Sequence, residues 1–182
     1  KHIFSAFLIG MFISEIVSYG IFFELWNYKN ISPTDPSPFM DHISYSVYLS
    51  FTSILLLTRL LDSAEDSIKL KIGYSIFFLS STINLFINGG RTGQLTFLIL
   101  IFFSVYMSFK NKISAVLISS IITLGIVTLA YEFSPNFHNR VNQIDTDLSK
   151  MINEDTYKGS LSARISLWIV GIDNFKDNFL TN

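Results

Sequence analysis

The sequence contains no cysteine, and only four prolines and three histidines occur among its 182 residues. The lack of cysteine excludes disulfides, thiolate nucleophiles and cysteine-ligated metals. Charged side chains are also scarce, at 15%, and a net charge of −1 provides no basic surface for a nucleic acid. The histidines are too widely spaced to suggest a metal site. We therefore expect no metal, no cofactor and no nucleic-acid partner.

Apolar residues are abundant instead. Hydrophobic residues make up 49% of the chain, with 18 phenylalanines and a mean hydropathy of +0.43. A helix crosses a hydrocarbon core with about 17–25 predominantly apolar residues. Five runs have this length, at residues 3–23, 43–61, 72–88, 93–109 and 113–131. The sequence therefore predicts an all-α fold, a polytopic helical membrane bundle with about five spans.

The two ends of the chain suggest a fragment. The first apolar run is too long for a secretory signal peptide, and no small-residue cleavage site follows it. We interpret it as a retained span. The chain begins with lysine and ends at Asn182 within an unfinished apolar pattern. We therefore expect a piece of a longer polytopic protein.

Positive charge distinguishes the two sides of the expected bundle. If the five runs alternate across the bilayer, one side carries the basic residues of the short connections: Lys1, Arg59, Lys69, Lys71, Lys110 and Lys112. Basic residues in short loops mark the cytoplasmic side. The other side, which receives residues 25–40 and 133–182, is then periplasmic. We expect a multi-pass protein of the bacterial inner membrane.

Two segments are expected from this topology: a transmembrane helical region at residues 1–132 and a periplasmic segment at residues 133–182. Residues 25–40 contain three of the four prolines, which disfavour helix and sheet interiors, so we expect an ordered loop. The periplasmic segment has two helical patterns, separated at Gly159-Ser160. Their apolar positions recur at helix spacing: Val141, Ile144, Leu148 and Met151, then Ile165, Trp168, Ile169, Ile172 and Phe175. We expect an extension of amphipathic helices on the membrane surface.

Arg91 lies in a polar break at residues 88–93, between the third and fourth runs. Two glycines precede it, so the backbone can turn tightly and approach a ligand, with the N–H groups of the next helix exposed. A planar guanidinium suits two oxygens of a phosphate. This pattern fits a diphosphate site. It fits equally well an arginine that closes a hairpin and extends to the lipid headgroups.

Three further residues are candidates for the same site. Arg164 precedes Trp168 by one helical turn, so a cation and an aromatic ring share a face. Arg140 begins the first amphipathic pattern and either adds a cation near the phosphates or belongs to the polar face of a helix. His42 follows Asp41 at the periplasmic mouth of the second span, where it could line the same cavity. Alternatively, water or Asp41 satisfies its ring.

Glu15 lies in the middle of the first run. A charged side chain there costs about 2.5–3.5 kcal/mol on insertion scales unless it is paired or protonated. We therefore expect Glu15 to face the bundle and to form hydrogen bonds with Ser14, Ser18 or Tyr19. A structural contact is favoured over a proton relay.

Three short motifs occur in an order that resembles the O-antigen ligase and polymerase family. They are Gly90-Arg91-Thr92-Gly93, Arg164-Ile165-Ser166-Leu167-Trp168 and Phe175-Lys176-Asp177-Asn178-Phe179. With the topology, the resemblance covers residues 40–182. It implies a metal-independent membrane glycosyltransferase that takes a glycan from an undecaprenyl-diphosphate carrier and joins it to a periplasmic lipid or glycan acceptor such as lipid A-core.

The resemblance also implies residue roles. Arg91 and Arg164 would hold the diphosphate. The catalytic histidine of the family normally lies beyond the Arg-x-x-x-Trp helix, so we expect it after Asn182, and the catalytic residue of this chain is unknown, with His42 the candidate inside it.

Other functions fit parts of the pattern. A polymerase would extend the glycan on its lipid carrier, and the sequence does not separate it from a ligase. In a polysaccharide transporter, Glu15 and the break at residues 88–93 would form a midplane site. The break, however, falls at the periplasmic boundary, and no paired discontinuous spans occur. A non-catalytic membrane component would explain neither Arg91 nor Arg164.

Overall fold

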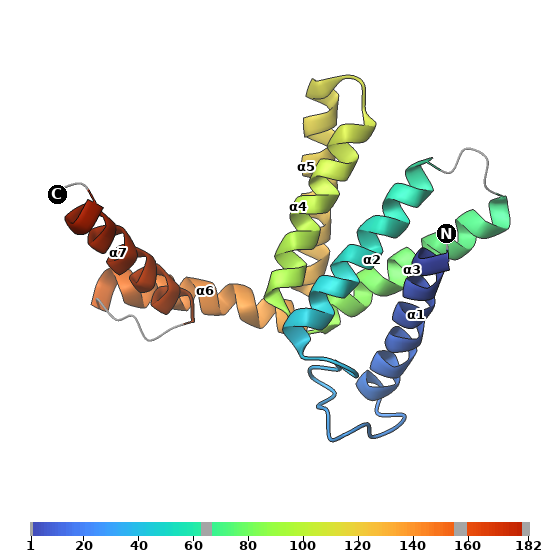
Figure 1. Cartoon of the computed structure of the whole chain (residues 1–182), viewed down its shortest axis with the longest axis horizontal. Coiled ribbons are helices and arrows are strands. Elements are labelled where there is room, and N and C mark those ends of the chain that lie inside the picture. Colours follow the sequence, from blue (N-terminus) through green and yellow to red (C-terminus); the bar gives the residue numbers. More distant parts are fainter. Residues whose placement is uncertain (1, 63–66, 155–159, 180–182) are drawn as a thin grey trace. The chain divides into compact units, whose positions relative to one another are not determined.

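The computed structural model describes residues 2–62, 67–154 and 160–179, and every regular element in these ranges is an α-helix. The chain divides into two compact units, Lys1–Phe137 and His138–Asn182, which we describe separately. The ribbon and its element labels are shown in Figure 1.

The first unit contains five long helices: α1 (His2–Phe22), α2 (His42–Asp62), α3 (Ile68–Ile87), α4 (Arg91–Ser108) and α5 (Lys112–Phe133). All five are long and apolar enough to cross a membrane. The predicted all-α, polytopic fold is therefore confirmed. The largest difference from prediction is at α3, which begins four residues earlier than expected, where Ser67 caps it by accepting a hydrogen bond from the Leu70 N–H.

Helix α2 is the centre of this unit. It packs against α3 on one side and α4 on the other, α5 packs on α4, and α1 makes fewer contacts with α3 and α2 (Figure 1). Tyr45, Leu49, Leu85 and Phe97 are fully buried in the core between these helices. Because α3 and α4 make few contacts with each other, they do not form a hairpin packed along its length.

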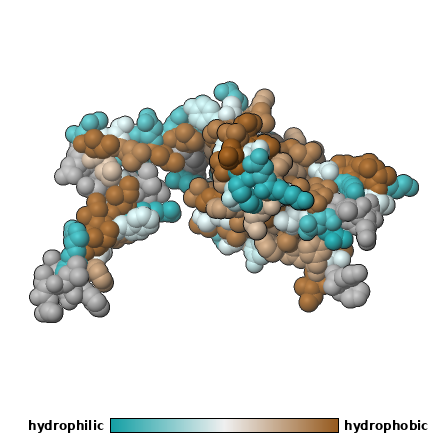
Figure 2. Space-filling view, turned by 90° about the horizontal axis from the view of Figure 1, so that it is seen from above, coloured by the Kyte–Doolittle hydropathy of each residue, from teal (hydrophilic) through white to brown (hydrophobic). Residues whose placement is uncertain are grey.

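The outer faces of the helices remain apolar. Large side chains such as Ile76, Leu95 and Ile121 are exposed, and hydrophobic surface covers much of this unit in Figure 2. Exposed apolar surface of this extent is typical of helices that face lipid.

Helix α4 approaches α2 closely because glycine leaves room. A Cβ on Gly93 would overlap the backbone of Ser46, and a Cβ on Gly90 would overlap the Ser46 side chain and the carbonyl of His42. Small residues allow such close approach of two helix backbones. Gly90 is one of the two glycines expected to let the backbone approach a ligand, and that expectation is wrong for it, because α2 fills the space beside its Cα.

Glu15 faces the inside of the bundle, as predicted, and is 2% exposed. Its partner is the hydroxyl of Ser80 on α3, which donates to Oε2 at 2.6 Å. The expected local partners were wrong. Ser14 and Ser18 donate to backbone carbonyls, and Tyr19 donates to the carbonyl of Ser80 at 2.7 Å. The hydroxyls near Glu15 in sequence are thus engaged elsewhere.

Residues 23–41 connect α1 to α2 without helix or strand, and the loop predicted at residues 25–40 lies within this connection. Glu24 ends α1 in the left-handed region, with φ 57°, and lets Leu25 donate to the carbonyl of Gly20 at 2.8 Å. Ser18 of α1 donates to the carbonyl of Pro36 at 2.6 Å. The middle of the loop is thereby held against the end of α1.

The chain after α5 forms two helices, α6 (Pro135–Glu154) and α7 (Ser160–Phe179). This confirms the two predicted helical patterns, although α6 begins five residues before Arg140 and belongs to the first unit as far as Phe137. Gly159, the predicted stop between them, lies outside the described residues.

Gly93→Ala should destabilise the first unit, because the added methyl group meets the backbone of Ser46, which cannot move aside as a side chain can. Overpacking of this kind costs about 1–3 kcal/mol. The measurement is the Tm of the detergent-solubilised protein. Gly125→Ala is the matched control, since a Cβ there meets nothing within 4 Å, and it should leave Tm unchanged or slightly higher. Equal shifts for both variants would contradict the close contact of α2 and α4.

Candidate functional site

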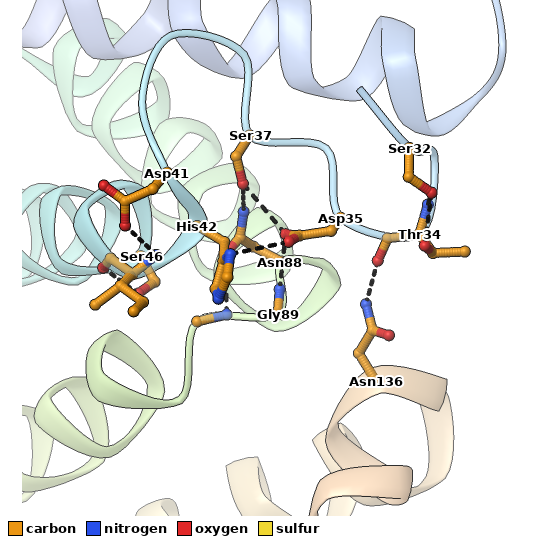
Figure 3. Close-up of polar contacts among 12 residues, drawn as sticks. Ser32, Thr34, Asp35, Ser37, Asp41, His42, Ser46, Asn88, Gly89 and Asn136 are labelled. Atoms are coloured by element: carbon orange, nitrogen blue, oxygen red, sulfur yellow. Dashed lines mark hydrogen bonds and ion pairs between the residues drawn. The ribbon is translucent and has the colours of Figure 1, made fainter. Parts of the chain in front are cut away.

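Polar groups gather where α3 gives way to α4, at the end of the bundle that carries the loop of residues 25–41 (Figure 3). We call this cluster the polar junction. Its members are Thr34, Asp35, Ser37, His42, Ser46, Asn88, Gly89, Gly90, Gln94 and Asn136. They come from the loop, from the starts of α2, α4 and α6, and from the three residues between α3 and α4.

Asn88 forms several of the hydrogen bonds that hold the break between α3 and α4. Its side chain is fully buried, donates to the Ser37 hydroxyl at 2.6 Å and accepts from the Gly90 N–H at 3.0 Å. Its own carbonyl accepts from the side chain of Gln94 at 2.9 Å. An unsatisfied polar group in such surroundings costs about 1–3 kcal/mol, so these bonds make a nonhelical turn possible there.

Asp35 links the loop to both the break and α2. Its Oδ1 accepts from the Gly89 N–H at 3.3 Å and from the Ser37 hydroxyl at 3.2 Å, and its Oδ2 lies 3.2 Å from Nδ1 of His42. Figure 3 shows these contacts converging on one carboxylate. A carboxylate beside Nδ1 places a proton on that nitrogen and directs Nε2 away from Asp35. The side chain of His42 is 44% exposed, so a ligand can approach the ring.

Asp41, the carboxylate expected beside His42, accepts hydrogen bonds from other residues. Its Oδ1 accepts from the N–H groups of Ile43 and Ser44 at 3.0 Å, and its Oδ2 accepts from the Ser44 hydroxyl at 2.7 Å. Asp41 is therefore the N-cap of α2, and its proposed contact with His42 was wrong. The hydrogen bonds from Ser44 hold the pKa of Asp41 below its ordinary value. The stabilising effect of the ionised cap is present above the ordinary pKa of aspartate and is lost as the pH falls through the lowered one.

Arg91 is the first residue of α4 and is partly buried. It was expected inside a six-residue break, but the break comprises only residues 88–90, because α4 already begins at Arg91. Two N–H groups near the start of α4 are also in use: Gly90 donates to the Asn88 side chain, and Gly93 donates to the Ser46 hydroxyl at 3.3 Å. These two N–H groups are therefore not open to a ligand, in contrast to the expectation of exposed N–H groups at this helix start.

The start of α6 closes the junction. Asn136 donates through Nδ2 to the carbonyls of Thr34 at 2.7 Å and Ile87 at 2.6 Å. Ser134 donates to the carbonyl of Phe86 at 2.6 Å. The last carbonyls of α3, which have no partner within the helix, are thus satisfied by the segment after α5.

Asp35 and Asn136 were missed by the sequence argument. Asp35 stands between Pro33 and Pro36, and Asn136 follows Pro135 at a helix start. Both positions are typical of turns and caps, so the sequence contained a signal for a local role. It contained none for their partners in other helices.

The second unit holds the other predicted cations. Arg164 is exposed in the second turn of α7, and Trp168 is exposed one turn later, which confirms their predicted helical spacing. Within the described part of the chain, the cation–π contacts join other residue pairs. Arg140 lies in α6, but its side chain is outside the described residues, as are the side chains of residues 177–179.

The helices and the polar junction define a multi-pass membrane protein with a guanidinium at one end of its bundle. A family model described as O-antigen ligase matches residues 76–181, which include Arg91 and Arg164. Since the match covers more than half of the chain, the protein belongs to the O-antigen ligase family and is a membrane enzyme of the ligase and polymerase kind. The predicted family resemblance is confirmed. No curated protein and no solved structure matches the chain.

Asn88→Ala should destabilise the junction, because it removes the bond to the Ser37 hydroxyl and leaves the Gly90 N–H without its partner. The expected loss in the free energy of unfolding is about 1–3 kcal/mol, seen as a lower Tm in detergent. Ser37→Ala should cost less in the Asn88→Ala background than in the wild type, since only its bond to Asp35 is then left to lose. Asn153→Ala, at an exposed position of α6, is the control and should keep the wild-type Tm. An unchanged Tm in Asn88→Ala would refute the role of this side chain.

Proposed function

We propose that this chain is the donor-binding part of an enzyme that transfers a glycan from undecaprenyl diphosphate to a periplasmic acceptor. In a ligase the acceptor is a lipid such as lipid A-core, and in a polymerase it is a second lipid-linked glycan. The observation that carries the proposal is the family match, which spans both arginines.

The chemistry explains why arginines would be needed. The bond between the anomeric carbon and a diphosphate oxygen breaks, and the oxygen of the acceptor hydroxyl bonds to the same carbon. The hydroxyl proton goes to a base, and the departing diphosphate gains negative charge. Cations that are already in position stabilise that charge in the transition state. Guanidinium groups can do this without a metal ion, so we propose metal-independent transfer.

Arg91 is our first diphosphate ligand. It begins α4 at the bundle end that carries the polar junction, while Arg59, Lys69 and Lys112 lie near the opposite ends of their helices. The positive-inside rule assigns those basic ends to the cytoplasm and Arg91 to the periplasmic side. The polar junction fixes the backbone on both sides of Arg91, which favours preorganised binding.

Arg164 is our second diphosphate ligand, and Arg140 is a further candidate. We propose that residues 1–132 form the transmembrane region in the bacterial inner membrane and that residues 25–40 and 133–182 are periplasmic. In this arrangement α6 and α7 would lie on the membrane surface with Trp168 at headgroup level. By resemblance to the family, the catalytic base would be a histidine beyond Asn182.

Arg91→Ala and Arg164→Ala should each reduce glycan transfer about 100- to 1,000-fold, the usual effect of removing one group that stabilises transition-state charge. Arg91→Lys should also lose activity, since a point charge does not replace the planar fork of donors. The measurement is glycan transfer by the full-length enzyme in membranes of cells that lack their own copy.

Arg59→Ala is the matched control, because it removes the same kind of side chain from the end of α2 that lies away from the polar junction. It should retain wild-type transfer, and immunoblots of membrane fractions should show equal insertion of all variants. Wild-type transfer by both Arg91→Ala and Arg164→Ala would overturn the proposed function. Full activity in Arg91→Lys would show that Arg91 serves only as an interfacial anchor.

A further inference from the structure

The His42–Asp35 pair lies outside the family match at residues 76–181, so the match assigns it no role. The arrangement is specific all the same. Asp35 uses Oδ1 for the Gly89 N–H and the Ser37 hydroxyl, and uses Oδ2 for Nδ1 of His42. The imidazole of His42 is therefore held at Nδ1 by the carboxylate of Asp35, which is itself bonded to Gly89 in the break between α3 and α4.

A purely structural role explains this pair poorly. Without the imidazole, Asp35 would keep its bonds to Gly89 and Ser37. His42 is 44% exposed, so its ring fills little of the core. Side-chain hydrogen bonds that orient an exposed histidine are typical of sites where the second ring nitrogen meets a ligand.

His42 also begins its helix beside the start of α4. Gly90 packs so closely on the carbonyl of His42 that a Cβ would overlap it, and Arg91 follows directly. The side chains of His42 and Arg91 therefore leave neighbouring helix starts at the same end of the bundle. Three ionisable groups lie near His42. Asp35 of the loop contacts its ring, Asp41 precedes it in the chain, and Arg91 of α4 follows Gly90, which packs on the His42 carbonyl.

We propose that His42, oriented by Asp35, binds the lipid diphosphate beside Arg91 as an imidazolium. This inference rests on the proposed function. The carboxylate of Asp35 faces Nδ1–H and stabilises the positive ring, and Nε2–H donates to a phosphate oxygen. The role is that of a cation on the leaving-group side and differs from that of a base, which would need Nε2 without its proton.

The donor KM of His42 variants tests this assignment, because a side chain that holds the diphosphate contributes to donor binding. The assay uses membrane vesicles with the full-length enzyme and an undecaprenyl-diphosphate-linked glycan as donor. His42→Gln should raise the donor KM and lower kcat/KM roughly 10- to 100-fold, the effect of losing a hydrogen bond to a charged group. Its Tm should stay at the wild-type value.

Two charge variants sharpen the test. His42→Lys keeps a cation at this position, so it should recover much of the activity lost in His42→Gln. Asp35→Asn still offers an oxygen to Gly89 but has no charge beside the ring, so it should also raise the donor KM. Asp41→Asn is the matched control, since Asp41 caps α2, and it should keep the wild-type donor KM.

Two results would overturn the inference. A wild-type donor KM in His42→Gln with a strongly reduced kcat, together with an inactive His42→Lys, would make His42 a base. Wild-type kcat/KM and donor KM in His42→Gln would make it structural. The arginine variants distinguish failure of this inference from failure of the proposed function: if both Arg91→Ala and Arg164→Ala retain transfer, the proposed function fails, and if they are inactive, the His42 variants decide the role of His42 alone.

Discussion

Where α3 ends and α4 begins, three residues leave the helical pattern, and their backbone N–H and C=O groups need partners other than lipid. Side chains from three places supply those partners: Asn88 within the break, Asp35 from the loop and Gln94 from α4. Asn136, from the start of α6, does the same for the carbonyl of Ile87, the last residue of α3. The loop and the ends of four helices are positioned by this single requirement.

The same contacts set the geometry of the candidate site. Asp35 shares its two oxygens between the break and His42, so the imidazole and the turn before Arg91 keep a fixed relation. Gly90 and Gly93 bring the start of α4 onto α2, which places Arg91 next to the first turn that carries His42. If the site binds a diphosphate as we propose, groups arranged in this way need no rearrangement when charge develops on it.

The sequence predicted what depends on local composition and missed what depends on distant neighbours. Five spans follow from apolar length, and the family follows from short motifs, so both were found. Asp35 and Gly89 are 54 residues apart, and Asn136 and Thr34 are 102 apart, so no spacing rule connects them. Gly90 was misinterpreted for the same reason: a glycine that allows a tight turn and one that admits a neighbouring helix look alike in sequence.

The buried carboxyl group of α1 has a consequence for the order of membrane insertion. Ser80, which donates to Glu15, follows it by 65 residues, so the ribosome completes α1 well before α3 exists. During that interval α1 carries a polar group whose native partner has not been synthesised. The native packing of α1 is therefore completed only after α3 has been synthesised.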